Sequence, residues 1–247
     1  MLMPEEIPIA FLILLPIVSF FYASVGHGGA SGYLGLMALF SFPIGLMKPT
    51  ALLLNLFVAA ISFIQFKRFG FFQWRLFYPF ALSSVPAAFL GGYLSVDAGL
   101  YKKILAVVLF IAILKLLGLF GKESMVLNKL KLWQGILVGV IIGLVSGMIG
   151  IGGGIILSPV ILIMKWGDMK TAAAVSALFI WVNSAAAMFG LVLKGTSINL
   201  NIAGLIVLAL FGGWLGAYYG SRYVNNKTLR LILASVLVLA CFKLVVI

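Results

Sequence analysis

The chain has 247 residues, of which 64% are hydrophobic and only 9% are charged. A soluble domain carries roughly 25% charged residues, and a water-facing globule of this length cannot bury so much apolar surface in one core. The composition therefore excludes a soluble protein and predicts an integral membrane protein. The single cysteine, Cys241, excludes an internal disulfide and a multi-cysteine metal site.

The 17 lysines and arginines outnumber the five acidic residues, which gives a net charge of +12. The basic residues lie mostly in short loops between apolar runs, and no aromatic–basic module accompanies them. We expect them to orient the protein in the membrane, because loop lysines and arginines stay on the cytoplasmic side. We therefore expect membrane lipids as neighbours and no nucleic-acid partner. A secondary effect of the charge is attraction of anions.

Ten apolar segments follow one another along the chain, and a spanning helix needs about 20 such residues. The first lacks the pattern of a cleavable signal and is expected to be a structural helix. The second segment of each half is much shorter, which suits a helix that re-enters the membrane without crossing it. The segments are Ile7–Val25, Ala30–Phe42, Thr50–Phe66, Leu76–Leu94, Leu100–Phe120, Leu132–Ile149, Gly154–Met164, Thr171–Leu193, Ile202–Gly220 and Thr228–Val246.

The two halves are copies of one unit. The stretch ILAVVLFIAILKL (104–116) matches ILASVLVLACFKL (232–244) at eight positions, including a lysine. Earlier in each half, Asn55 falls near Asn183 and Thr50 near Ser176, and the glycines Gly26, Gly28 and Gly29 fall opposite Gly150, Gly152 and Gly153. We predict a single transmembrane transport domain over 1–247, with repeat 1 at 7–120 and repeat 2 at 132–246.

The basic residues indicate how the two copies are related. If the first two segments of each copy form a re-entrant hairpin, each copy crosses the membrane an odd number of times and the copies are inverted. Twelve of the 17 basic residues then share one side, and five lie on the other: Lys48, Lys102, Lys103, Lys194 and Lys243. A single kinked span would divide them almost evenly, against the positive-inside rule. We therefore expect inverted repeats with both termini outside the cytoplasm; two full crossings by the pair would give the same parity.

Glycine clusters interrupt the apolar pattern at matching places, in YASVGHGGASG (22–32) and GMIGIGGGIIL (147–157). Non-helical backbone at membrane depth survives only where protein buries it or where it lines a wet cavity. A short helix follows each cluster, and a helix N-terminus is a ready site for an anion. We predict that two inverted copies aim two such ends at one central anion. The alternative is that the glycines allow close helix packing.

No aspartate or glutamate lies inside an apolar segment, which argues against a cation site or an acidic proton relay. His27 is the only histidine and lies in the first glycine cluster, opposite Ile151 in the second. It could donate a hydrogen bond to an anion or carry a proton. A loop histidine bonded to neighbouring backbone is the alternative.

Asn55 and Asn183 lie inside apolar segments, where an amide can bind substrate or join helices. Helical Ser and Thr can do the same, although they often bond their own backbone. We expect no catalytic residue, no metal ligand and no cofactor. The predicted substrate-binding residues are Gly26, His27, Gly28, Gly29, Ser31, Thr50, Asn55, Gly150, Gly152, Gly153, Gly154, Ser176 and Asn183.

With these motifs the chain resembles the TauE/SafE family of sulfite exporters. The resemblance rests on SVGHGGASGYLGLMAL, GLVSGMIGIGGGIILSPVIL, LMKPTALLLN and DMKTAAAVSALF, and covers nearly the whole chain. It implies transport of small anions, especially sulfur oxyanions and organosulfonates, across the cell membrane. The family's glycine motif then falls on Gly26, Gly28 and Gly29, and on Gly150, Gly152, Gly153 and Gly154. The first copy departs from the motif through His27.

The sequence thus predicts an all-α integral membrane protein with two inverted repeats, each a glycine-broken re-entrant helix pair plus three transmembrane helices. Its expected function is secondary transport of a small, sulfite-like anion by alternating access. An anion channel with the same site and a carboxylate transporter remain alternatives, as does a non-transporting subunit. An enzyme is not expected, because one histidine and no buried acid leave no catalytic pair. The sequence leaves a homodimer open.

Overall fold

The computed structural model describes residues 7–117, 127–196, 202–222 and 238. Within these ranges the chain forms nine α-helices and no strand, which confirms the all-helical expectation for the described residues. The tenth expected segment, Thr228–Val246, lies outside the described residues apart from Val238. The helices are α1 (Ile9–Ser24), α2 (Ala30–Leu39), α3 (Ile44–Arg68), α4 (Trp74–Tyr93), α5 (Ala98–Leu116), α6 (Leu132–Ile149), α7 (Gly154–Ile163), α8 (Met169–Leu193) and α9 (Ala203–Arg222).

Four helices, α3, α6, α8 and α9, are long and apolar enough to cross a membrane. By contrast α2 and α7 have 10 residues each. At 1.5 Å per residue such a helix reaches only about 15 Å, half of a hydrocarbon core. The structure therefore confirms two short helices, one directly after each glycine cluster.

The helix α3 differs from the expected segment, since it begins at Ile44 rather than at Thr50. Pro43 is its N-cap, and Pro49 lies inside the helix. Pro49 is the sixth residue of α3, close to the helix start, where the helix tolerates the lost hydrogen bond and the ring contact with the carbonyl four residues earlier, and it continues through Lys48 and Pro49. Lys48, expected in a loop, is consequently buried within α3.

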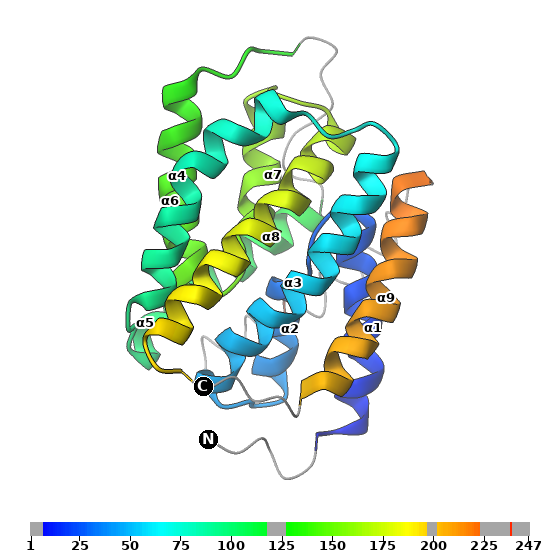
Figure 1. The fold of residues 1–247 in the computed structure, drawn as a ribbon. Helices are drawn as coiled ribbons and strands as arrows, with labels where there is room; N and C mark the ends of the chain where they lie inside the picture. The colour runs from blue at the N-terminus through cyan, green and yellow to red at the C-terminus, as the bar shows by residue number, and fades with distance from the viewer. Residues whose placement is uncertain (1–6, 118–126, 197–201, 223–237, 239–247) are drawn as a thin grey trace.

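Helices that hold the same place in the order of each half run in opposite directions. In Figure 1, α1, α3 and α9 run from the lower end of the molecule to the upper end, whereas α4, α6 and α8 run downward. The long helices α3 and α8 pack side by side at the centre, with α2 in the lower half and α7 in the upper half. Each half contributes to both sides of the molecule, because α1 packs on α9 and α6 packs on α4.

Glycines allow these two helix pairs to approach closely. A Cβ atom on Gly212, Gly216 or Gly220 of α9 would overlap the backbone of α1, and one on Gly139, Gly143 or Gly147 of α6 would overlap the backbone of α4. Spacing of four residues places each set on one helix face. Small residues at such spacing are a common device for helix association in lipid. These glycines therefore account for packing, whereas those of the two clusters require a separate explanation.

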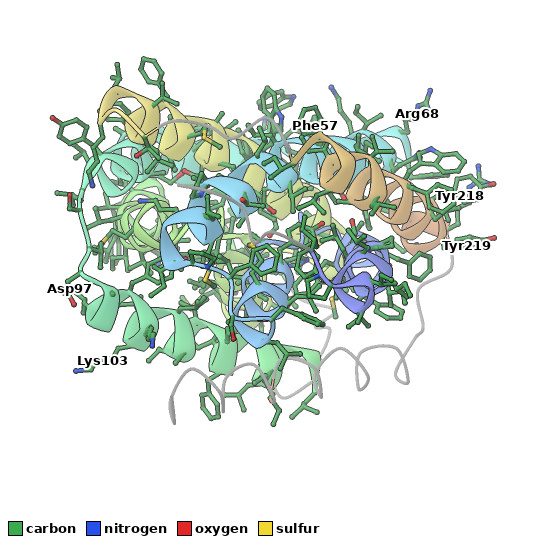
Figure 2. All side chains as sticks on the ribbon, turned by 90° about the horizontal axis from the view of Figure 1, so that it is seen from below. Phe57, Arg68, Asp97, Lys103, Tyr218 and Tyr219 are labelled. Atoms are coloured by element: carbon green, nitrogen blue, oxygen red, sulfur yellow. The ribbon has the colours of Figure 1, made fainter. Side chains whose placement is uncertain are left out.

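Large apolar side chains also cover the outside of the helix bundle. Ile9, Leu82, Val107, Phe189 and Val207 are all exposed, and Figure 2 shows that Phe57 likewise points away from the helices. An apolar surface of this extent fits contact with lipid and not with water. Together with the spanning helices it supports a multi-pass membrane protein.

The charged residues gather at the two ends of the molecule. Eight described cations lie at helix ends or in connections that Figure 1 shows at the upper end of the molecule: Lys67, Arg68, Arg75, Lys129, Lys131, Lys165, Lys170 and Arg222. Four others lie toward the lower end: Lys48, Lys102, Lys103 and Lys194. The described cations therefore follow the uneven division predicted from the sequence.

Candidate functional site

The first glycine loop, residues 25–29, joins α1 to α2. Gly26 and Gly29 have φ angles of 75° and 97°, a region that side chains with a Cβ atom rarely adopt. The turn satisfies its own backbone, since the N–H groups of Gly26 and His27 donate to carbonyls of the last turn of α1. Gly29 then caps the start of α2. Glycine is required here by backbone conformation.

The second glycine loop, residues 150–153, repeats this geometry between α6 and α7. Gly150, Gly152 and Gly153 have φ angles of 92°, 69° and 82°. Gly150 ends α6 by donating to the Ser146 carbonyl at 2.7 Å, and Gly153 caps α7. The sequence correctly predicted that both clusters break a helix and start a short one.

Each loop packs against the long helix of the other half, at equivalent positions. A Cβ atom on Gly26 would lie 2.6 Å from the Ala173 carbonyl oxygen, and one on Gly150 would lie 3.0 Å from Lys48 Cγ. Lys48 and Ala173 are the fifth residues of α3 and α8. Each loop therefore packs near the start of one of the two long central helices.

The middle glycines of the two loops also share their neighbours. A Cβ atom on either Gly28 or Gly152 would meet both Asn55 and Ile180. These are the twelfth residues of α3 and α8, so the structural equivalent of Asn55 is Ile180. The sequence comparison placed Asn55 near Asn183, which lies almost one helical turn further along α8.

His27 connects the first loop to the start of α7. Its Nδ1 lies 2.8 Å from the Val25 carbonyl oxygen, and its Nε2 lies 3.2 Å from the Gly154 carbonyl oxygen and 3.1 Å from Ser158 Oγ. Carbonyl oxygens only accept, so Nδ1 carries a hydrogen. Nε2 can then accept from Ser158 in a neutral ring or donate to Gly154 in a protonated one. Both protonation states of this buried ring have a hydrogen-bond partner.

Asn55 connects the two loops directly. Its Oδ1 accepts the N–H of Ala30, the first residue of α2, at 3.0 Å. Its Nδ2 donates to the Ile151 carbonyl and to Ser184 Oγ, both at 3.3 Å. The side chain is fully buried. An amide oxygen thus lies at the N-terminus of α2, the position predicted for an oxygen of the anion.

The remaining predicted side chains divide into those near His27 and those that face elsewhere. Ser176 Oγ lies 2.7 Å from Ser158 Oγ and so extends the His27 cluster into α8. Ser31 donates to Tyr22 of α1 instead, and Asn183 donates to the Phe179 carbonyl of its own helix. The amide oxygen of Asn183 is buried without a hydrogen-bond partner. Thr50 is buried in the second turn of α3.

The structure adds three residues outside the predicted set: Ser158, Ser184 and Lys48. Ser158 flanks the second loop by sequence, and Ser184 follows Asn183 directly, so position alone could have suggested both. Lys48 Nζ donates to the carbonyls of Gly91 and Gly92 in the last turn of α4, both at 3.2 Å. A cation at a helix C-terminus is stabilising. No sequence signal distinguishes Lys48 from a loop lysine, because it stands between two apolar segments and next to a proline.

The charges and helix dipoles around this site are mainly positive. Two helix N-termini and Lys48 contribute positive charge, and His27 adds more when protonated. Among the described residues the only acids are Asp97 and Asp168, both exposed, and no group of His, Cys, Asp and Glu is arranged to hold a metal ion. Asp168 accepts the Thr171 N–H as the N-cap of α8. The described residues of the site thus suit an anion or a neutral polar solute.

Comparison with known proteins identifies the family of this chain. A model of the TauE/SafE sulfite exporter family matches residues 10–244, which is nearly the whole chain. The chain belongs to the TauE/SafE family. Membership accounts for the multi-pass helical fold and indicates a membrane transporter rather than an enzyme.

Relatives of this TauE/SafE protein carry general transporter names. The chain is 37% identical to the probable membrane transporter protein y4hK of Sinorhizobium fredii, over 92% of the chain and 94% of the relative. It is 25% identical to the probable membrane transporter protein MJ0441 of Methanocaldococcus jannaschii, with the same shares covered. The YunE protein of Bacillus subtilis, also a probable membrane transporter, is 31% identical over 45% of the chain. No solved structure matches the chain.

Proposed function

We propose that this TauE/SafE protein is a secondary transporter that moves a small anion, a sulfur oxyanion or organosulfonate, across the cell membrane by alternating access. The observation that carries the proposal is the direct connection of the two helix-breaking loops through Asn55 and His27. Discontinuous helices that meet at the midplane are where transporters of repeated architecture bind substrate. A site without a buried acid favours an anion over a metal cation.

The two halves are inverted repeats in this proposal. Equivalent helices run in opposite directions in Figure 1, and each loop contacts the equivalent position of the other half's long helix. A two-fold axis in the membrane plane produces both features. The more basic upper end faces the cytoplasm, so both termini lie outside it. One repeat then rocks against the other during transport.

The described conformation is the closed form of the cycle. His27 and Ser158 are 3% exposed, and Asn55 and Ser184 are 0% exposed. Opening requires that the contacts of Asn55 and His27 across the two loops be exchanged for contacts with substrate. The oxyanion takes the place of the Asn55 amide oxygen at the N-terminus of α2. The His27 ring has a hydrogen-bond partner in both its neutral and its protonated form, which allows a proton to move with the anion. The membrane potential is the other source of energy for transport.

Reconstitution tests this function. We expect liposomes that contain the purified protein to take up labelled sulfite, sulfate or an alkyl sulfonate saturably, and His27→Gln to lower the rate about tenfold or more, since one lost transition-state hydrogen bond is worth that much. Asn183→Ala tests the second predicted amide in the same assay. Acetate is the comparison substrate. Uptake of acetate alone would favour a carboxylate transporter, single-channel currents would favour a channel, and no flux would contradict transport.

Lys48 serves in this proposal as the fixed positive charge beside the second loop. We expect Lys48→Met, which keeps the length of the stem, to raise the KM for the anion by about tenfold, because one charge interaction in a partly dry site is worth at least that factor. Lys48→Arg keeps the charge and should retain most of the activity. A role limited to capping α4 would lower the melting temperature of Lys48→Met and leave KM unchanged.

A further inference from the structure

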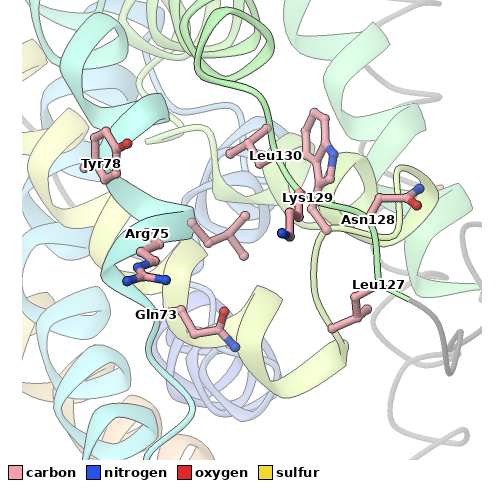
Figure 3. Close-up of a pocket in the computed structure, with 9 residues that line it drawn as sticks. Gln73, Arg75, Tyr78, Leu127, Asn128, Lys129 and Leu130 are labelled. Atoms are coloured by element: carbon pink, nitrogen blue, oxygen red, sulfur yellow. The ribbon is translucent and has the colours of Figure 1, made fainter.

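A polar pocket lies at the upper end of the molecule, away from the glycine loops. It has a volume of about 600 Å³ and lies between the start of α4 and the segment 127–131. Figure 3 shows Arg75 and Lys129 on opposite sides of it. Ligand pockets generally measure roughly 300–1,000 Å³, so this one is large enough for an organic molecule.

The described lining residues are amphiphilic, and none of them is acidic. Its polar residues are Gln73, Arg75, Tyr78, Asn128 and Lys129. Its apolar residues are Leu76, Leu127, Leu130 and Trp166, of which Leu76 and Trp166 are buried. Neither Arg75 nor Lys129 forms an ion pair within the described part of the chain, whose two acids lie outside the pocket. Two unpaired cations in one pocket repel each other, and an anion between them removes that repulsion.

Two hydrogen bonds hold segment 127–131, which forms one wall of the pocket. The Asn128 backbone N–H donates to the Lys165 carbonyl at 2.7 Å, and its side-chain amide donates to the Met164 carbonyl at 3.1 Å. Segment 127–131 is therefore tied to the turn between α7 and α8. This anchoring fixes Lys129 opposite Arg75 before any ligand binds, which lowers the entropic cost of binding.

The pocket lies at the depth of lipid headgroups. Trp74 and Trp133 begin α4 and α6 at this end, and both are exposed. Tryptophans at helix ends mark the interface between water and hydrocarbon. A ligand here meets water on one side and apolar chains on the other.

We propose that this pocket binds an amphiphilic oxyanion, with its phosphate or sulfonate group between Arg75 and Lys129 and its apolar part against Leu127 and Trp166. Two sources share this chemistry: an anionic phospholipid and a free organic anion. The pocket is separate from the central site, so occupancy here does not depend on transport.

Binding to the purified full chain in detergent tests the site by thermal shift. The probes are dihexanoyl phosphatidylglycerol, its zwitterionic phosphatidylcholine analogue and hexanesulfonate, each below its micelle concentration. We expect one of the two anions to stabilise the protein and the zwitterionic lipid to do so much less. Arg75→Gln/Lys129→Gln should weaken the anion's affinity about tenfold or more, because each basic residue near an anionic headgroup contributes severalfold.

Lys131→Gln is the matched control, since Lys131 lies on the same segment and outside the pocket lining. It should keep the affinity of the unmodified chain for both anions. His27→Gln alters only the central site and should keep the affinity for phosphatidylglycerol. A larger effect of phosphatidylglycerol assigns the pocket to lipid, and a larger effect of hexanesulfonate that Arg75→Gln/Lys129→Gln removes assigns it to a free anion. Equal affinity in the double variant and the unmodified chain would overturn the site, whatever the result of the flux assay.

Discussion

Gly26→Ala is expected to destabilise the protein far more than Gly70→Ala. Both glycines have positive φ, 75° and 77°, so both variants bear the same backbone strain of about 1–2 kcal/mol. They differ in their surroundings. The new Cβ atom at Gly26 meets the backbone of Ala173, with Cα at 2.7 Å, whereas nothing lies within 4 Å at Gly70. Backbone cannot rotate away, so the overlap adds about 1–3 kcal/mol.

The measurement is thermal unfolding of the two variants in the same detergent. The difference between them isolates the contact of the first glycine loop with α8. Gly150→Ala offers an intermediate case, because its nearest neighbour is the flexible stem of Lys48 at 3.0 Å. Equal melting temperatures for Gly26→Ala and Gly70→Ala would mean that the first loop does not rest on α8.

Local backbone features of this fold are predictable from sequence. The clusters around Gly26 and Gly150 predict broken helices because a run of glycines stabilises turns with positive φ, and the apolar runs after them predict short helices. The repeat and the charge division predict the arrangement of the described cations. The glycine and apolar-run signals are carried by residues that are neighbours along the chain, and the other two by comparison of whole segments.

The partners of these residues are not predictable in the same way. The sequence suggests a symmetric pair of amides, Asn55 and Asn183, because both stand in apolar runs. The structure joins Asn55 to the second loop and pairs Asn183 with its own helix, since the register of α3 and α8 places Ile180 opposite Asn55. A shift of three residues on a helix turns a side chain by about 60°, enough to change what it faces.

The surroundings of the charged residue Lys48 are likewise not predictable from sequence. A lysine near a proline reads as a loop residue, and by sequence it contributes only to orientation. Its burial follows from the start of α3 at Ile44 and from two carbonyls of α4 that lie distant in sequence. The upper pocket likewise combines the start of α4 with segment 127–131 and Trp166, three stretches that sequence alone does not bring together.

Asn55→Leu is expected to destabilise the protein strongly, whereas Asn183→Leu is expected to be nearly neutral. Leucine has almost the same shape as asparagine, so neither variant opens a cavity. Asn55→Leu leaves the Ala30 N–H, the Ile151 carbonyl and Ser184 Oγ without this partner. Even at the modest value of about 0.6 kcal/mol for one hydrogen bond between membrane helices, three lost bonds cost about 2 kcal/mol, and unpaired buried groups raise the cost further.

Asn183→Leu loses one bond within α8 and removes an amide oxygen that is already unpaired. Replacing an unsatisfied buried polar group by an apolar one of the same shape changes stability little. Asn55→Asp separates hydrogen bonding from shape, because its carboxylate still accepts from Ala30 and Ser184 but repels the Ile151 carbonyl oxygen. Its melting temperature should fall between those of Asn55→Leu and the unmodified chain. If Asn55→Leu and Asn183→Leu have equal melting temperatures, Asn55 does not join the two loops. The central site then loses the contact that brings its two helix ends to one place.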